Sequence, residues 1–297
     1  MTAPLFIICP GRSFSSVVAS MIGQHPQAYG MPELNLFIGP TLGASAELHG
    51  STGRTELVGL KRVLAKLHDG VQTFETVQRA EIWIKENVGM TGKEVFAYLQ
   101  SLLPDRMLVE KSPANTTSDA SLNRVLQAFP EASYLQLLRH PRSRGKSQAA
   151  AVNNYPALRI LAKMSGGVDY ENHWSKPHRR IHTLGRALPC GQLLRIRGED
   201  LLRQPQVYLP QICDWLGISS APEAIESMLH PEDSPYSCIG PSNARAGTNR
   251  GFLENPKLDL EKMAAMVNPT LEAPMDWAPD RHFSAVTREL AGWYGYR

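Results

Sequence analysis

The sequence predicts a three-layer α/β fold in which helices cover both faces of a doubly wound, mainly parallel sheet. Apolar runs at residues 5–9 and 133–138 are typical of buried strands, and two further short strands are expected at residues 107–110 and 192–196. Segments with helical spacing separate these runs, and that alternation favours parallel strands joined by helices. A length of 297 residues, with 42% hydrophobic and 20% charged residues, fits one large soluble α/β domain or two small ones.

The expected helices follow the strands in chain order. The first covers residues 15–22, because its apolar spacing ends at Gly23 and the next His-Pro pair stops a helix. Further helices are expected at residues 56–68, 71–88, 91–103, 119–129, from 142 to about 152, 170–188, 204–216, 259–266 and 284–293. Residues 39–54 are rich in Gly, Ser and Thr and are expected to form a mobile loop. Residues 231–256 have the least regular pattern, and so long a loop in a compact domain is usually functional.

The bulk composition excludes several classes of protein. A net charge of +3 is too small for a general nucleic-acid binder, although it allows local basic pockets for an anionic ligand. The four cysteines lie far apart without a CxxC pair, which argues against a zinc site and predicts reduced, mostly buried thiols in a cytoplasmic protein. The apolar run at residues 5–9 is too short to span a membrane and lacks the basic flank of a signal peptide.

The first candidate site is the loop after the first strand, residues 10–16 (PGRSFSS). A strand, a tight turn and a helix start aim backbone N–H groups and the positive end of a helix dipole at one point, where a phosphate or sulfate group binds. Arg12 adds a permanently charged guanidinium that grips two oxygens at once. The layout is P-loop-like but lacks GxxxxGK[ST], which disfavours simple nucleotide hydrolysis. The alternative is that Ser15 only caps the helix and Arg12 is a solvated turn residue.

The second candidate site follows the strand at residues 133–138. Arg139 is expected at its carboxyl end, where open α/β sheets bind ligands. Ser147 lies eight positions on, two helical turns into the next helix, and can face the same ligand. Two anion sites on separate strand ends predict a ligand with two separated phosphate groups. The alternative is that Arg139 only caps neighbouring carbonyl groups.

These two loops resemble those of the cytosolic-type sulfotransferase family, in particular its bacterial and polyketide-associated members. Residues 194–201 (LRIRGEDL), with Pro205 and a helix ending at Gly217, add to the resemblance, as do residues 110–113 (EKSP). The similarity covers about residues 4–220. The family transfers a sulfuryl group from 3′-phosphoadenosine 5′-phosphosulfate (PAPS), so the resemblance implies the same donor, a P-loop-like fold and transfer to a hydroxyl or amine.

The resemblance also implies which residues hold the donor. The 5′-phosphosulfate would be held by the first loop: Arg12, Ser13, Phe14, Ser15, Ser16 and Val17. The 3′-phosphate would be held by Arg139 and Ser147, together with Arg245 in a segment, RAG, that echoes a late Arg-Lys-Gly motif of the family. Two departures stand out. Arg12 replaces a common lysine, and Gly198 stands where the family often has a tyrosine against the adenine, so that contact must come from elsewhere.

Transfer to an alcohol needs a proton acceptor near the attacking oxygen. Bacterial relatives often have Glu in a segment like residues 31–34 (MPEL), so the resemblance implies that Glu33 is the general base. The alternative is a surface carboxylate at a helix start. Among the histidines, His25 is expected to be structural, His140 to orient the second loop, and His49 to be a minor candidate base.

The same resemblance implies how charge is stabilised. Arg12 and the amides of residues 13–17 would stabilise the leaving phosphate and the sulfuryl oxygens. Lys111 would reach the transferring group from a third strand end, or else it lies on the surface. No metal is required, because the protein supplies the cations. The products would be adenosine 3′,5′-bisphosphate (PAP) and a sulfated acceptor.

Other residues on the expected helices have ordinary roles. Three tryptophans are expected in the core: Trp174, Trp215 and Trp293. Three histidines at helical spacing are expected on a solvated face: His173, His178 and His182. The basic run at residues 176–180 is expected to be solvated, with binding of an acidic acceptor or a carrier-bound phosphopantetheine as the alternative.

One sulfotransferase-like domain is expected over residues 1–297, with a helical insert at about 39–105 as a lid over the acceptor site. The acceptor, a small molecule or a carrier-bound chain, and the oligomeric state stay open, and no nucleic acid partner is expected. Two other functions remain: a P-loop-type phosphotransferase or nucleotide kinase, and a non-catalytic PAPS- or PAP-binding protein. Magnesium dependence would favour the kinase, and unchanged activity after substitution of Arg12 and Glu33 would argue for misassigned residues or a binding role.

Overall fold

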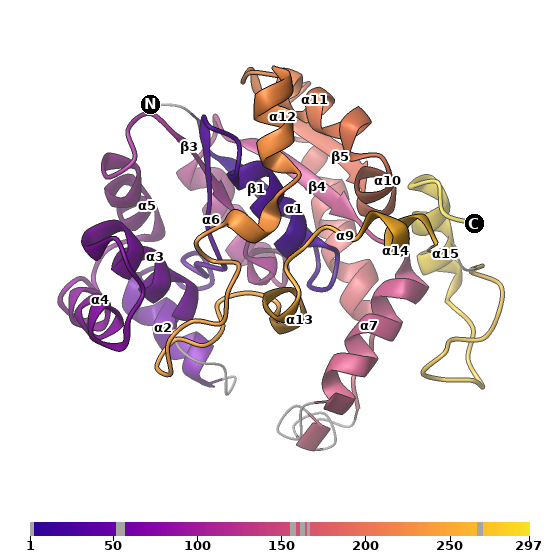
Figure 1. Ribbon diagram of the computed structural model, residues 1–297. Coiled ribbons are helices and arrows are strands. Elements are labelled where there is room, and N and C mark those ends of the chain that lie inside the picture. Colours follow the sequence, from indigo (N-terminus) through magenta and orange to yellow (C-terminus); the bar gives the residue numbers. More distant parts are fainter. Residues whose placement is uncertain (1–2, 52–56, 155–158, 161–163, 165–166, 266–269) are drawn as a thin grey trace.

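A computed structural model describes residues 3–51, 57–154, 159–160, 164, 167–265 and 270–297 (Figure 1). Within these ranges, five parallel strands form one sheet in the order β2-β3-β1-β4-β5. The strands are β1 (Leu5–Ile8), β2 (Ala28–Gly30), β3 (Met107–Glu110), β4 (Ser133–Leu138) and β5 (Leu193–Arg197). Because all of them run the same way, the loops that follow β1, β3 and β4 meet at one edge of the sheet.

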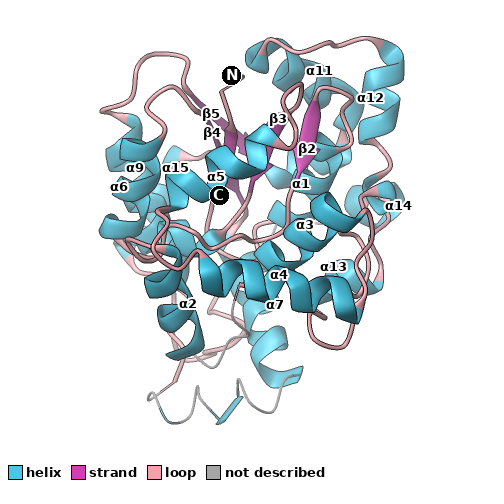
Figure 2. Ribbon diagram, turned by 90° about the vertical axis from the view of Figure 1, so that its left-hand side faces the viewer, coloured by secondary structure: helices cyan, strands magenta, loops and turns pink. Residues whose placement is uncertain are grey.

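Helices cover both faces of this sheet, as the three-layer prediction requires (Figure 2). In the part of the chain before β4 they are α1 (Ser15–Gly23), α2 (Leu42–Ser51), α3 (Val58–Asp69), α4 (Phe74–Glu86), α5 (Gly92–Ser101) and α6 (Asp119–Ala128), with the 3₁₀ turn η1 (Pro113–Thr116). After β4 they are α7 (Pro141–Asn154), α9 (Asn172–Gly185), α10 (Gly198–Arg203), α11 (Pro205–Leu216), α12 (Pro222–Met228), α13 (Arg250–Glu254), α14 (Leu260–Ala264) and α15 (Ala285–Trp293), with the 3₁₀ turn η2 (Pro231–Asp233).

Strand β1 shows how one sheet supports two cores. Its side chains alternate between the faces, as the pleat of a strand requires. Phe6 and Ile8 belong to the buried cluster under α3, α4, α5, α6 and α9. Leu5 and Ile7 belong to the cluster under α1, α10, α11 and α12. The continuous apolar run that predicted this strand is therefore explained by burial on both sides.

The sequence prediction missed β2 and several helices, among them α10, α12 and α13. Strand β2 is only three residues long and has no apolar run, yet Ala28 pairs with Met107 and Gly30 with Val109. Helix α10 begins directly after β5, without a separating turn signal. The predicted strand at residues 192–196 is consequently the fifth strand, not the fourth.

The prediction of a mobile loop at residues 39–54 is wrong for the described residues, because α2 occupies Leu42–Ser51. Tertiary contacts hold this segment: the Leu42 amide donates to the Met90 carbonyl at 2.8 Å and the Gly43 amide to the Val88 carbonyl at 2.9 Å. Buried Ser45 donates to the Leu36 carbonyl at 3.1 Å. Such contacts override the weak helix propensity of Gly and Ser. Figure 1 shows α2 to α5 grouped on one side of the sheet; their action as a lid stays a prediction.

Several burial predictions were also wrong. Trp174 is fully buried as expected, but Trp293 is 55% exposed. His178 is fully buried instead of solvated, because α9 turns it toward β4, where its ring lies 3.1 Å from the Gln136 side-chain amide. The cysteines are all free thiols, but Cys190 and Cys238 are exposed, so burial is not the general rule. No helix within the described ranges has the length and apolar character needed to cross a membrane.

Candidate active site at the carboxyl ends of the strands

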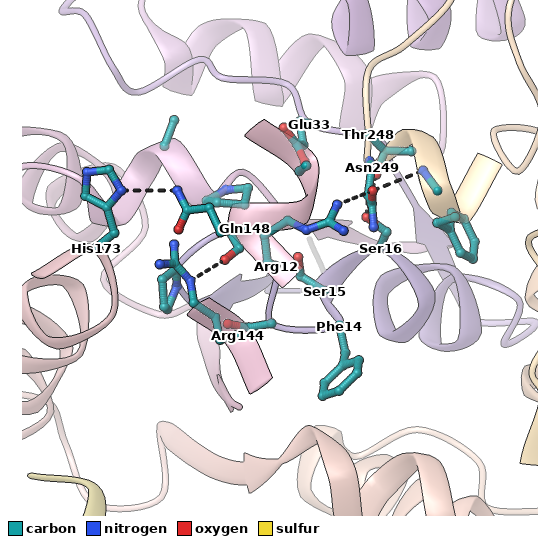
Figure 3. A pocket seen from close by; sticks show the side chains of 18 of the residues that line it. Arg12, Phe14, Ser15, Ser16, Glu33, Arg144, Gln148, His173, Thr248 and Asn249 are labelled. Carbon is teal, nitrogen blue, oxygen red and sulfur yellow. Dashed lines mark hydrogen bonds between the residues drawn. The ribbon is translucent and has the colours of Figure 1, made fainter. Parts of the chain in front are cut away.

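A cavity of about 1100 Å³ lies at the shared strand edge (Figure 3). Segments far apart in the chain line it. They are residues 10–17 of the first loop, Glu33 and Asn35, Val58 and Gly59, the turn around η1, Arg139, parts of α7 and α9, and residues 246–252. The predicted first and second loops therefore meet at one site, together with a third strand end and the irregular late segment.

The first loop exposes the start of α1 to this cavity. Arg12 (φ 71°) and Phe14 (φ 63°) both adopt left-handed backbone conformations, which turn the chain sharply into the helix. Phe14 occupies the N-cap position without a side-chain cap, and Ser15 is the first helical residue. The alternative in which Ser15 caps the helix is therefore wrong. The amides of the first turn have no capping side chain, which leaves an anion-binding helix terminus.

Arg12 links three segments across the cavity. Its Nε donates to Ser147 Oγ on α7 at 3.1 Å, and its Nη1 donates to Asn249 Oδ1 at 2.5 Å (Figure 3). The alternative of a solvated turn residue is therefore wrong. Asn249 is the N-cap of α13, so Arg12 joins the first loop both to the second strand–helix unit and to the late segment.

Arg139 is held next to Arg12 by a different arrangement. Its Nη1 donates to the Arg12 carbonyl at 2.8 Å, and its guanidinium carbon lies 4.2 Å from the centre of the Phe14 ring. Its Nε is buried and has no hydrogen-bond partner within the described part of the chain. Burial, with a contribution from the Arg12 charge, lowers the pKa of Arg139 to about 10. The alternative was that Arg139 only caps neighbouring carbonyl groups. It does bond one such carbonyl, but its buried Nε stays unpaired among the described residues.

Lys111, at the end of β3, lies behind the cavity and contacts residues that line it. The residue is only 1% exposed, so the surface alternative is wrong. Its Nζ donates to Glu33 Oε1 at 2.9 Å, to Thr248 Oγ1 at 2.7 Å and to Ser16 Oγ at 3.3 Å. All three ammonium protons therefore have acceptors. Lys111 ties the candidate base to the first helix and to the late segment.

A buried carboxyl group supports this strand end from behind. Glu110 accepts hydrogen bonds from the Ser112 hydroxyl, from the Ser112 amide at 3.2 Å and from Asn115 Nδ2 at 3.1 Å. Ser112 Oγ in turn accepts from the Asn35 amide at 2.9 Å. Burial raises the pKa of Glu110 to about 7. This network fixes the loop that carries Lys111 relative to the loop that carries Glu33.

The structure brings most of the predicted site residues together. Cavity-lining residues among them are Arg12, Ser13, Phe14, Ser15, Ser16, Val17, Glu33 and Arg139. Ser147 takes part through its contact with Arg12. Arg245 does not: its side chain is exposed and lies outside the cavity lining. Arg250, five positions later, lines the cavity instead, and its Nε donates to Glu254 Oε1 at 2.9 Å.

The histidine predictions have mixed outcomes. His25 is structural as expected, since it is buried and its Nε2 lies 2.8 Å from the Ser219 carbonyl. His140 is buried, and its Nδ1 accepts from the Arg142 amide at 3.2 Å; its role in orienting the second loop stays a prediction. The side chain of His49, the minor candidate base, lies outside what the structure describes.

Sequence reasoning missed three residues of the site. Arg144 is buried and donates from Nε to the Gly11 carbonyl at 2.9 Å, and burial together with Arg139 lowers its pKa to about 9. Thr248 and Asn249 hold Lys111 and Arg12. The basic run after Arg139 was a usable signal for Arg144. For Thr248 and Asn249 the only signal was that their segment is long and irregular.

Metal-ligating side chains do not gather here. Across the described ranges, no group of three or more His, Cys, Asp or Glu residues is placed to hold a metal ion. The charged groups at the cavity are mostly cations, namely Arg12, Arg139, Arg144, Lys176, Arg180 and Arg250, against the carboxylates Glu33 and Glu254. The cavity is therefore suited to a ligand that carries several negative charges.

Comparison with known proteins agrees with this geometry. A family model described as the sulfotransferase family matches residues 4–222. The sulfotransferase domain of the olefin synthase from Synechococcus PCC 7002 is 25% identical, with a TM-score of 0.73 over 100% of this chain and 97% of that domain. A sulfotransferase domain from the curacin biosynthetic pathway has the same fold, with 21% identity and a TM-score of 0.75 over 100% and 99% of the two chains. No protein with a curated description matches.

Proposed function

The chain belongs to the sulfotransferase family, and on that premise we propose that it transfers a sulfuryl group from PAPS to a hydroxyl or amine of an acceptor. The observation that carries the proposal is the convergence of three strand ends on one cavity beside an uncapped helix terminus, where Arg12 and Arg139 line the cavity and Lys111 is bonded to Glu33 behind it. A donor with anionic groups at both ends of a nucleoside matches that distribution of cations.

Unpaired polar atoms support this donor. Ser13 Oγ and Arg139 Nε are both buried and have no hydrogen-bond partner among the described residues. Buried donors are normally satisfied, so these two are suited to oxygens that a ligand supplies. We assign the phosphosulfate end to the loop from Arg12 to Val17 and the 3′-phosphate to Arg139. Ser147 reaches the same region while it accepts from Arg12.

The proposed step is an in-line displacement at sulfur. The acceptor oxygen or nitrogen forms a bond to sulfur while the bond from sulfur to the bridging phosphate oxygen breaks, and the electron pair stays on that phosphate. Glu33 accepts the proton of the acceptor. Arg12 stabilises the charge that develops on the oxygens, and Lys111 holds the Glu33 carboxylate in place from behind; these hydrogen bonds are present before the reaction begins.

The acceptor is proposed to enter beside Glu33, past helices α2 to α5, for which we propose the role of a lid. One solved relative is a domain of an olefin synthase. A domain of that kind favours an acceptor chain held by another part of an assembly.

Calorimetry with PAP, AMP and ATP tests the donor assignment. We expect PAP to bind at least about 100-fold more tightly than AMP, because only PAP reaches Arg139 with a second phosphate. Equal binding of PAP and AMP would refute the assignment. Tight, magnesium-dependent binding of ATP would indicate a phosphotransferase instead.

Glu33→Gln tests the base. The readouts are inorganic sulfate released from radiolabelled PAPS with water as acceptor, and labelled phenyl sulfate formed with phenol as acceptor. We expect transfer to fall about 10²–10⁴-fold, as is usual for loss of a general base, while calorimetric binding of PAP stays within about threefold. Unchanged transfer with intact PAP binding would show that Glu33 is not the base.

A further inference from the structure

We propose that Phe14 is a positioning residue: its ring holds the Arg139 guanidinium in place and thereby sets the selectivity for a 3′-phosphorylated nucleotide. This inference rests on the proposed function, because it concerns the same donor site. It assigns a role to a side chain that neither caps α1 nor forms part of the hydrogen-bond network around Arg12.

The backbone of Phe14 is the first observation. A φ of 63° places a bulky aromatic residue in the left-handed region, where L-residues other than Gly, Asn and Asp are rare. A side chain in this conformation persists only where its surroundings stabilise it, and such residues cluster at functional sites. Glycine would adopt the same turn without strain, so the ring itself must contribute something.

The packing of the ring is the second observation. The Arg139 guanidinium carbon lies 4.2 Å from the ring centre, a close cation–π contact. The ring also lies close to the start of α10. A Cβ added at Gly198 would come within 2.6 Å of Phe14 Cδ2 and 3.2 Å of the Leu138 carbonyl. Phe14 therefore fills the space that a side chain at position 198 would need.

The direction of the ring separates its role from that of Arg12. Figure 3 shows the Phe14 side chain turned away from Arg12, Ser16 and Glu33, which surround the region assigned to the transferring group. Its contact with the Arg139 guanidinium joins this ring of the first loop to the second loop.

The bonding of Arg139 is the third observation. Among the described residues no carboxylate lies within ion-pair distance of it, although the more distant Glu199 charge raises its pKa against the effect of burial, and one of its nitrogens bonds the Arg12 carbonyl. Its Nε is buried without a partner. A buried cation in this state needs an anion, and a ligand phosphate can supply it. Because the ring covers one face of the guanidinium, the polar edge stays available for that phosphate.

Removal of the ring should therefore weaken the binding of the 3′-phosphate and leave the binding of the rest of the nucleotide unchanged. In Phe14→Leu we expect the affinity for PAP to fall about 10-fold and the affinity for AMP to stay within about twofold, measured by calorimetry. Phe14→Tyr keeps an aromatic face and should retain most of the preference for PAP. Thermal unfolding of each variant checks that it folds.

A double-mutant cycle separates positioning from direct contact. In an Arg139→Ala background, Phe14→Leu should have no further effect on PAP binding, because nothing is left to position. Additive losses would overturn the proposal. Equal loss of PAP and AMP affinity in Phe14→Leu would also overturn it, since the ring would then contact the part that both nucleotides share.

Gly198→Ala approaches the same ring from the start of α10 and serves if Phe14→Leu folds poorly. Its new methyl group would displace the ring, so the same selective loss of PAP affinity is expected. An unchanged preference for PAP in both variants would refute the positioning role. A wild-type protein without any preference for PAP over AMP would instead contradict the proposed donor, so the two failures are distinguishable.

Discussion

The two anion loops hold their arginines in contrasting ways. In the loop after β1, the Arg12 guanidinium donates hydrogen bonds to Ser147 on α7 and to Asn249 in the late segment. In the loop after β4, Arg139 stacks on Phe14, forms one hydrogen bond to a main-chain carbonyl and keeps a buried nitrogen unpaired. Both side chains lie at strand ends of the same sheet, and Arg139 bonds the carbonyl of Arg12 itself.

This contrast suggests different roles for the two cations. A guanidinium held by hydrogen bonds has its direction fixed, but a ligand must exchange or share those partners. A guanidinium held by an aromatic face keeps its polar edge open, so it gains a full set of bonds when an anion arrives. We therefore expect Arg12 to act mainly on the rate of transfer and Arg139 mainly on the choice of nucleotide.

The largest effect should follow removal of the cation beside the transferring group. In Arg12→Ala we expect sulfate release from PAPS to slow by about 10²–10³-fold, as for the loss of one donor that stabilises developing charge. PAP affinity should fall less, by under about 10-fold. Arg12→Lys should recover only part of the rate, because an ammonium cannot contact Ser147 and Asn249 with one planar fork. Equal losses in rate and affinity would remove the distinction between the two loops.

A smaller effect, confined to binding, should follow substitution in the second loop. In Arg139→Ala we expect PAP affinity to fall about 10–100-fold, the range for a lost hydrogen bond between charged groups, with AMP affinity unchanged. Lys146→Ala is the matched control, since this exposed lysine on α7 does not line the cavity. A preference for PAP that survives in Arg139→Ala would place the 3′-phosphate elsewhere.

The smallest effects are expected in how the free energy of unfolding depends on pH. Two buried groups that follow strand ends, Glu110 and His140, have pKa shifts of opposite direction. Burial raises the pKa of Glu110 from its usual 4.5 to about 7, so the folded protein keeps a proton that the unfolded chain releases. The stability that protonated Glu110 contributes is lost as pH rises from about 4.5 to about 7. Burial lowers the pKa of His140 from 6.5 to about 4, so stability is lost as pH falls through that window.

Paired variants test these signs by urea unfolding at several pH values. Relative to wild type, Glu110→Gln should become more stable as pH rises from about 5 to about 7.5. His140→Asn, whose side-chain oxygen can still accept from the Arg142 amide, should gain relative stability as pH falls from about 6.5 to about 4. The same pH trend in both variants would contradict the opposite shifts.

Local patterns carried enough information for most of the framework. The buried strands at residues 5–9 and 133–138 were predicted from apolar runs, and Arg12 and Arg139 from their positions directly after such strands. Strand β2 and helix α2 were not recoverable in this way, because β2 exists through pairing with β3 and α2 is held by main-chain bonds to Val88 and Met90.

The candidate site also combines residues that the local sequence could predict with contacts that only the fold creates. Glu33 and Lys111 could be proposed separately, yet their contact at 2.9 Å joins residues 78 positions apart. Arg245 was a plausible anion ligand by its motif, but the fold leaves it exposed and brings Thr248 and Asn249 to the cavity instead. Nothing in the local sequence distinguishes these neighbours, because their roles depend on where the late segment crosses the strand ends.

By itself, then, the sequence determined the strand–turn–helix units and the charges placed at their ends, since apolar periodicity and turn residues act over a few positions. The tertiary structure alone decided which cation meets which partner. It brought Phe14 against Arg139 and Gly198, and Lys111 against Glu33 and Thr248. Those contacts arise from the packing of distant segments around a shared sheet edge, and packing of that kind is a property of the whole fold.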